Sequence, residues 1–145
     1  MQHTLILNPG EWHAEGRFIN ENEVSIPAEG TIRILHEFDA WRYESEIRIH
    51  NDQEPDIKNK YIIQPWQEGS EFLNWSAANT LMGNLRGKFL LVAETIISQF
   101  YSEEGDYVGS EVMLMQNDKS YYSRGITFVG DHKLSSWGLN LTQKF

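Results

Sequence analysis

The sequence predicts an all-β protein that folds as one antiparallel up-and-down β-barrel of about ten strands. Apolar and polar residues alternate over most of the chain, as they do in strands with one buried and one solvated face. Short clusters of Gly, Asn, Asp and Pro separate these runs, and no stretch shows the 3.6-residue period of a helix. Uniformly short connections favour an up-and-down barrel over a sandwich with Greek-key crossings.

Composition and charge narrow the possible functions. The chain has 145 residues, so we expect residues 1–145 to form a single barrel domain with a real core. A formal net charge of -9, with 12 basic residues scattered singly, argues against nucleic acids and anionic membranes as partners. There is no cysteine, which excludes disulfides and thiolate chemistry.

The sequence shows neither a secretory leader nor an apolar run long enough to cross a bilayer. We therefore expect a cytoplasmic protein that has no membrane partner and exists as a monomer or a homodimer. Aromatic residues make up 12% of the chain, with five Trp, a share that suits either a β core or a lined cavity.

The N-terminal half begins with a short apolar patch and continues as strands. The patch of residues 5–7 is followed by Asn8 and Pro9, so residues 1–9 are expected to form an N-terminal extension or a plug at one end of the barrel. Strands are predicted over residues 11–20, 24–26, 31–38, 41–50, 57–66 and 71–78. The clearest is the one that starts at Trp41, because apolar or small residues alternate there with charged ones.

The C-terminal part, residues 87–145, reads as a meander of four or five strands. Its apolar runs are residues 89–93, 96–97, 112–115, 126–129 and 137–141. Turn residues lie between most of them, and turns between β-rich runs at this spacing indicate hairpins joined in succession. With the N-terminal strands, the count reaches nine or ten.

The tripeptide Gly10-Glu11-Trp12, at the start of the first clear strand, resembles the Gly-Xaa-Trp signature of the calycins, the superfamily that holds lipocalins and fatty-acid-binding proteins. The resemblance implies a lipocalin-like barrel in which Trp12 closes one end against a basic residue, here Arg124 or Lys144. No helix is predicted after the last strand or as a lid between the first two, so the pattern looks like the ten-stranded nitrobindin-like branch. That branch binds haem through a His near the last strand, and His132 lies in about that place.

A barrel of about ten strands is wide enough to enclose a cavity. Alternation predicts an apolar wall for it that includes Trp41, Tyr43, Ile47, Met113, Met115, Tyr122 and Phe128. His36 shares a face with Ile32 and Ile34, so it could present an imidazole to the cavity. The alternative for His36 is a core histidine whose ring nitrogens are satisfied by protein groups.

Arg124 is the second candidate anchor, because it shares a face with Tyr122 and Phe128. An inward guanidinium would bind a carboxylate with two hydrogen bonds, as the resemblance to fatty-acid-binding proteins implies. The alternative is the structural stack over Trp12. No His or carboxylate pair has the spacing of a metal site or stands out as a catalytic acid and base.

Four functions follow as hypotheses. The first is a small-molecule-binding barrel that holds a hydrophobic or aromatic ligand. The second is an isomerase, lyase or hydrolase that uses His36 as its acid or base. The third is a haem protein in which His132 ligates the iron, and the fourth is a structural module with a filled interior. Apart from haem in the third, we expect no cofactor.

Overall fold

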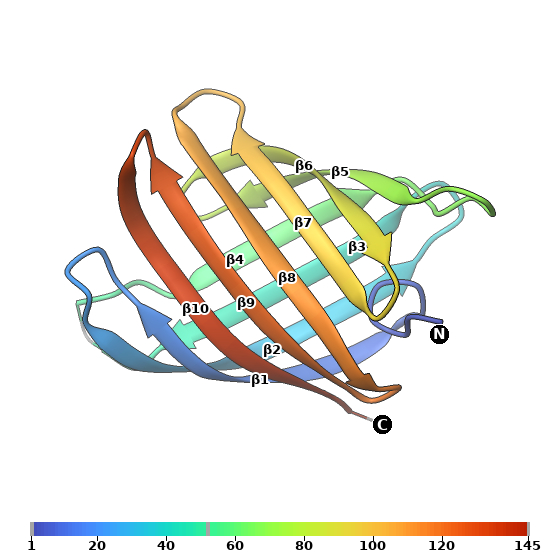
Figure 1. Cartoon of the computed structure of the whole chain (residues 1–145), viewed down its shortest axis with the longest axis horizontal. Helices are drawn as coiled ribbons and strands as arrows, with labels where there is room; N and C mark the ends of the chain where they lie inside the picture. Colours follow the sequence, from blue (N-terminus) through green and yellow to red (C-terminus); the bar gives the residue numbers. More distant parts are fainter. Residues whose placement is uncertain (1, 52, 145) are drawn as a thin grey trace.

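The computed structural model describes residues 2–51 and 53–144 and shows a closed antiparallel barrel of ten strands (Figure 1). The strands are β1 (Gly10–Ile19), β2 (Ser25–His36), β3 (Trp41–Ile49), β4 (Ile57–Ile63), β5 (Phe72–Asn79), β6 (Gly83–Val92), β7 (Thr95–Ser102), β8 (Tyr107–Asn117), β9 (Ser120–Val129) and β10 (His132–Gln143). Each strand pairs with its neighbours in sequence, and β1 also pairs with β10. The fold class predicted from the sequence is confirmed.

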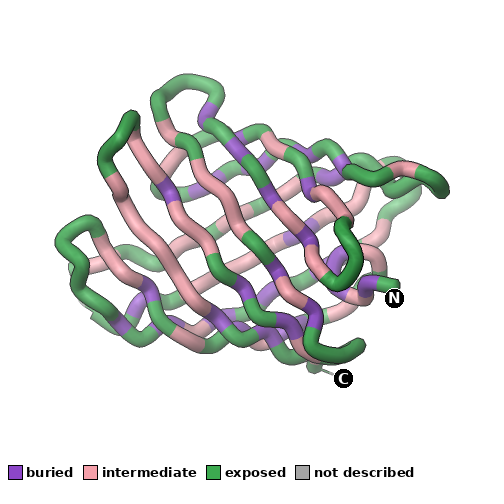
Figure 2. The backbone as a smooth tube through the Cα atoms, viewed as in Figure 1, coloured by how far each residue is buried: buried purple, intermediate pink, exposed green. Residues whose placement is uncertain are grey.

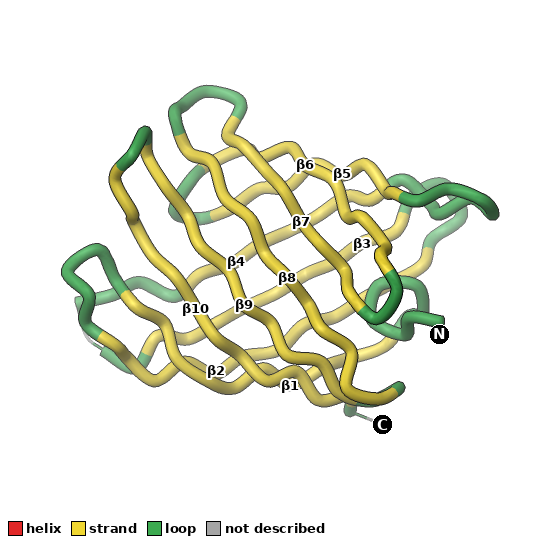
Figure 3. Tube along the Cα trace, in the orientation of Figure 1, coloured by secondary structure: helices red, strands yellow, loops and turns green. Residues whose placement is uncertain are grey.

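Strand is the only regular structure of the described residues, which include no helix (Figure 3). None of them therefore belongs to a helix that could cross a membrane. Buried and less buried positions alternate along the strands (Figure 2). The alternation is most regular in β5, where every second residue from Leu73 to Asn79 is buried. This alternation places one face of each strand inside the barrel.

Strand β2 is longer than the sequence pattern suggests, because residues 27–30 continue the strand where a turn is expected. Gly30 explains the difference. A Cβ atom at Gly30 would overlap the carbonyl oxygen of Glu46 on β3, so this glycine marks a close approach of two strands. Pro27 is tolerated because it lies near the start of the strand.

The barrel has two different ends. The β1–β2, β3–β4, β5–β6, β7–β8 and β9–β10 connections lie at the end that we call the open end, on the left and upper side of Figure 1. The remaining connections and the N-terminal segment, residues 2–9, lie at the opposite end, which we call the closed end.

The N-terminal segment folds into the closed end. Leu5 and Ile6 have no exposed surface, and the backbone turns there with a positive φ of 74° at Ile6. The Tyr121 hydroxyl, on β9, lies 2.7 Å from Nδ1 of His3 and accepts hydrogen bonds from the backbone N–H groups of Thr4 (3.1 Å) and Leu5 (3.4 Å). One buried phenol therefore holds three consecutive residues of the segment.

Candidate functional site

A cavity of about 350 Å³ opens toward the open end of the barrel. Its apolar lining is Phe18, Ala28, Ile32, Tyr43, Ile47, Ile57, Tyr61, Leu81, Met82, Leu85, Phe100, Tyr107, Leu134, Trp137, Leu139 and Leu141. Its polar lining is Asn20, Glu21, Asn22, Ser45, Glu54, Asn59, Asn79, Glu111, Ser123, Thr127 and Ser135. A concave, mostly apolar site with a few polar groups is the usual form of a small-molecule site, and its volume lies within the usual range of about 300–1,000 Å³.

Glu111 is the polar centre of this cavity. Its Oε2 atom accepts a hydrogen bond from the Ser123 hydroxyl at 2.7 Å and another from the Trp137 indole N–H at 3.0 Å. Burial raises the pKa of Glu111, and the two hydrogen bonds counteract this rise because they favour the ionised form. The carboxyl group is thus held in one orientation by neighbours on β9 and β10.

Strand register brings these three residues together. Gly125 on β9 lies opposite Glu111 on β8 on one side and opposite Trp137 on β10 on the other. A Cβ atom at Gly125 would overlap the Trp137 indole. Because glycine has no side chain, the indole lies across β9 and its N–H reaches the carboxylate one strand further on.

Tyrosines from β3 and β4 line the cavity together with Glu111. The rings of Tyr43 and Tyr61 have centroids 4.7 Å apart, and the Tyr61 ring also packs on Trp75 at 4.6 Å. Burial raises the pKa of both phenols, and the nearby negative charge of Glu111 raises it further. Both phenols are therefore neutral hydrogen-bonding groups near the carboxylate at neutral pH.

A second polar cluster lies on β3, β4 and β5. Asn79 donates a hydrogen bond to Asn59 at 2.6 Å, and Asn59 donates one to Ser45 at 3.3 Å. The Asn79 side-chain oxygen also accepts hydrogen bonds from the backbone N–H groups of Leu81 and Met82, both at 2.8 Å. These amides are largely satisfied by protein partners, so they order the β5–β6 turn at the mouth of the cavity.

Some residues that the sequence places in the wall lie elsewhere in the barrel. Tyr43 and Ile47 line the cavity, and their contact with a ligand stays a prediction. Met113 and Met115 point inward but are buried in the packed core rather than in the cavity lining. Trp41 stacks on His36 with ring centroids 3.8 Å apart, outside the lining.

His36 does not face the cavity, which corrects the prediction of an anchor or an acid–base group there. It ends β2 at the closed end, and its Nε2 lies 2.8 Å from the backbone oxygen of Ile6. The imidazole fixes the N-terminal segment, as a core histidine satisfied by protein groups would. Acid–base chemistry through His36 in the cavity has no geometric basis here.

Strand β9 presents the opposite face to the one predicted. Tyr121, Ser123 and Thr127 are buried, whereas Tyr122 and Arg124 are exposed, and Phe128 shares their outward side. Arg124 lies 5.3 Å from the centre of the Tyr122 ring and donates hydrogen bonds to two backbone oxygens. It therefore cannot bind a carboxylate inside the barrel.

Trp12 is fully buried at the closed end, as expected for a residue that closes the barrel, but its partner differs from the expected basic residue. Its indole packs edge-on against the Tyr121 ring at 5.6 Å. Arg124 lies on the outer surface, and Lys144 is exposed. Gly10 begins β1, and a Cβ atom there would come within 3.2 Å of the Gln143 side chain on β10.

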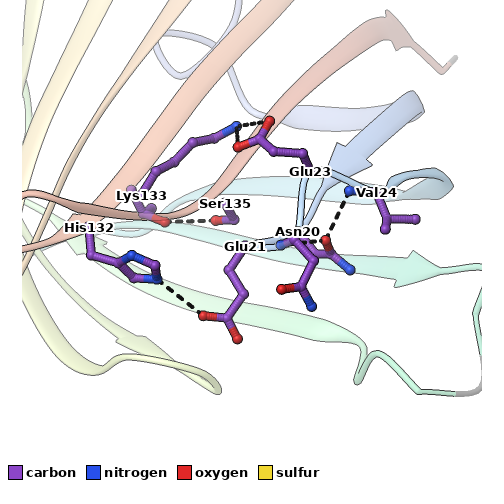
Figure 4. A network of polar contacts seen from close by, with 9 residues as sticks. Asn20, Glu21, Glu23, Val24, His132, Lys133 and Ser135 are labelled. Atoms are coloured by element: carbon purple, nitrogen blue, oxygen red, sulfur yellow. Dashed lines mark hydrogen bonds and ion pairs between the residues drawn. The ribbon is translucent and has the colours of Figure 1, made fainter.

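His132, the predicted haem ligand, begins β10 at the open end, and its imidazole faces Glu21 (Figure 4). Its side chain is 63% exposed, and Nε2 lies 3.4 Å from the Glu21 carboxylate. Lys133, the next residue, pairs with both oxygens of Glu23 at 3.1 Å. An exposed imidazole that faces a carboxylate does not fit an axial haem ligand. Haem binding through His132 stays a prediction.

Sequence reasoning did not single out Glu111, Ser123, Trp137 or Tyr61 as site residues. The sequence contains one sign that Glu111 points inward, because it lies on the same face of its strand as Met113 and Met115. An acidic residue in register with buried methionines indicates an inward carboxylate. The sequence has no comparable sign for Ser123 or Trp137, because their hydrogen bonds to Glu111 depend on how β8, β9 and β10 pair.

Comparison with known proteins supports the fold and leaves the family open. No protein-family model matches the chain, and no curated protein matches it either. The S-type phycobiliprotein lyase CPES from Guillardia theta has a similar structure, with a TM-score of 0.71, 10% sequence identity and coverage of 96% of this chain and 89% of that one. Rv2717c from M. tuberculosis has a TM-score of 0.73 at 9% identity, with coverage of 97% and 95%. These likenesses show a shared β-barrel fold.

Proposed function

We propose that this protein binds a small, mostly apolar or aromatic molecule in the barrel cavity. The observation that carries the proposal is the cavity itself, about 350 Å³ in volume and lined by aromatic and aliphatic side chains around one oriented carboxyl group. Burial of an apolar ligand there would contribute about 25 cal/mol per Å² of surface removed from water. The N-terminal segment closes the other end, so a ligand enters between the open-end loops.

The enzymatic hypothesis is the weaker alternative. The phycobiliprotein lyase has the same barrel fold, but a fold is shared by proteins of unrelated function. Within the described cavity lining, the ionisable side chains are carboxyl groups and phenols, with no imidazole. Binding needs only the cavity, whereas catalysis would need a second group poised to exchange protons with Glu111.

Titration with a neutral aromatic probe tests the proposal. We would add 4-phenylbutan-1-ol to the purified protein and follow the total tryptophan fluorescence, with a Trp137→Phe variant to identify the contribution of Trp137, which lines the cavity. The expected result is saturable quenching or enhancement. Native mass spectrometry and an absorption spectrum of the same sample would show any copurified ligand and would test the haem hypothesis through a Soret band.

A pair of serine substitutions provides the control. Ser45→Phe places a ring in the cavity, whereas Ser76→Phe places one on the outer face of β5. We expect Ser45→Phe to weaken probe binding about tenfold or more, which corresponds to about 1.4 kcal/mol, and Ser76→Phe to leave it unchanged. Equal effects of the two substitutions would contradict binding inside the barrel.

A further inference from the structure

We infer that the ligand of this cavity is an organic cation, a molecule with an apolar or aromatic body and a protonated nitrogen that pairs with Glu111. The inference rests on the proposed function, because it specifies which class of small molecule the cavity selects. It follows from the charges of the lining, the free oxygen of Glu111 and the aromatic walls.

The first argument is the sign of the charge in the cavity. The described lining residues include Glu111 inside the barrel and Glu21 and Glu54 at the mouth, and none of them is Lys, Arg or His. His132 and Lys133 lie nearby but face Glu21 and Glu23 rather than the interior. The whole chain carries a net charge of -9. An anionic ligand would meet charges of its own sign throughout, whereas a cation would meet only opposite charges.

The second argument is that only one of the two carboxylate oxygens of Glu111 accepts hydrogen bonds from described residues. Ser123 and Trp137 both donate to Oε2, and among the described residues no donor reaches Oε1. Two neutral donors orient the carboxylate, but they do not neutralise it. A carboxylate in a mostly apolar cavity is stabilised by an opposite charge. A protonated amine at Oε1 would provide that pairing and a charge-assisted hydrogen bond.

The third argument is the aromatic surface around the carboxylate. Tyr43, Tyr61 and Trp137 line the same cavity, and the charge of Glu111 acts on both phenols. The faces of aromatic rings attract cations, and they also bury the hydrocarbon body of an amphiphilic ligand. A carboxylate among aromatic rings thus suits an ammonium group better than it suits a neutral hydrocarbon.

Three probes with one body and different head groups test the inference. They are 4-phenylbutylamine, 4-phenylbutan-1-ol and 4-phenylbutyrate, which are a cation, a neutral molecule and an anion at pH 7. We would measure the affinity of each by isothermal titration calorimetry. Because hydrogen bonds to charged groups are stronger than those between neutral groups, we expect the amine to bind about tenfold or more tightly than the alcohol, and the acid to bind weakest.

Two isosteric substitutions locate the effect. Glu111→Gln removes the charge inside the cavity, and Glu44→Gln removes the same charge from the outer face of β3. We expect Glu111→Gln to abolish the preference for amine over alcohol while the alcohol still binds, and Glu44→Gln to preserve the preference. Circular dichroism confirms folding, and if Glu111→Gln does not fold, the ranking of the three probes on the native protein decides.

The outcomes separate the two proposals. An alcohol that binds as tightly as the amine, or a preference that persists in Glu111→Gln, would overturn the organic cation and leave the binding cavity in place. Tight binding of the acid would overturn it as well. Failure of all three probes to bind would overturn the proposed function and the inference together.

Discussion

Replacing Tyr121 with phenylalanine tests how the N-terminal segment is held in the closed end. The change removes one hydroxyl and leaves the ring that packs on Trp12. That hydroxyl bonds to His3 at 2.7 Å and to the backbone N–H groups of Thr4 and Leu5 at 3.1 and 3.4 Å. The substitution therefore removes the hydrogen-bond partner of all three groups at once. Water cannot take the place of the hydroxyl, because Tyr121 and Leu5 have no exposed surface.

The magnitude follows from these contacts. Each hydrogen bond contributes about 1 kcal/mol net, so the loss of three lowers the free energy of unfolding by about 3 kcal/mol. The unfolding entropy is about 2.1 cal/mol/K per residue, which for a chain of 145 residues turns this loss into a decrease in Tm of roughly 10 °C. A shift of that size is well outside the error of a thermal melt.

The assay is a melt followed by circular dichroism at pH 7.5, with Tyr122→Phe as the matched control. Tyr122 is the next residue on β9, but it is 42% exposed on the outer face, so the same chemical change there should move Tm by no more than about 2 °C. Equal shifts for the two variants would refute the role of the Tyr121 hydroxyl. A large shift for both would mean that β9 as a whole tolerates no change.

Three further predictions concern titration and packing. Because the pKa of Glu111 is raised, its ionisation destabilises the folded state as the pH rises above 4.5. The Tm of Glu111→Gln minus the Tm of the native protein should therefore increase between pH 4 and 8, and a constant difference would contradict this. Burial lowers the pKa of His3 below 6.5, so stability should fall as pH drops through 6.5, and melts of His3→Gln should lack this component. Gly125→Ala should cost about 1–3 kcal/mol because its Cβ overlaps Trp137, whereas Gly138→Ala, with ordinary contacts, should cost less in denaturant titrations.

The positions of the strands were predictable because the alternation of apolar and polar residues is a local signal in the sequence. Residues 41–50 show it most clearly, and β3 occupies nearly the same range. The inward face of β9 was not predictable in this way. The face of β9 that carries Phe128 is the more apolar of its two faces. The opposite face, which carries Tyr121 and Gly125, nevertheless points inward.

The reason for that reversal lies outside β9. Tyr121 must reach the N-terminal segment, which is 116 to 118 residues away in sequence, and Gly125 must leave room for Trp137 on the next strand. Similarly, Glu111 is 12 residues from Ser123 and 26 from Trp137. Such neighbours are created by register across β8, β9 and β10, and no local period reports them.

The position of the cavity, in contrast, is encoded in the sizes of the inward side chains. The closed end receives Trp12, Tyr121 and Met113, together with Leu5 and Ile6 from the N-terminal segment, and all of these are fully buried. Toward the open end the inward positions include small residues, among them Ala28, Ser45 and Thr127. The same ten strands form both ends, so the smaller side chains leave space unfilled at one of them. Glu111 stands two residues from Met113 along β8, where the packed core gives way to the cavity, and a ligand bound there would rest on the core with its polar group at the carboxylate.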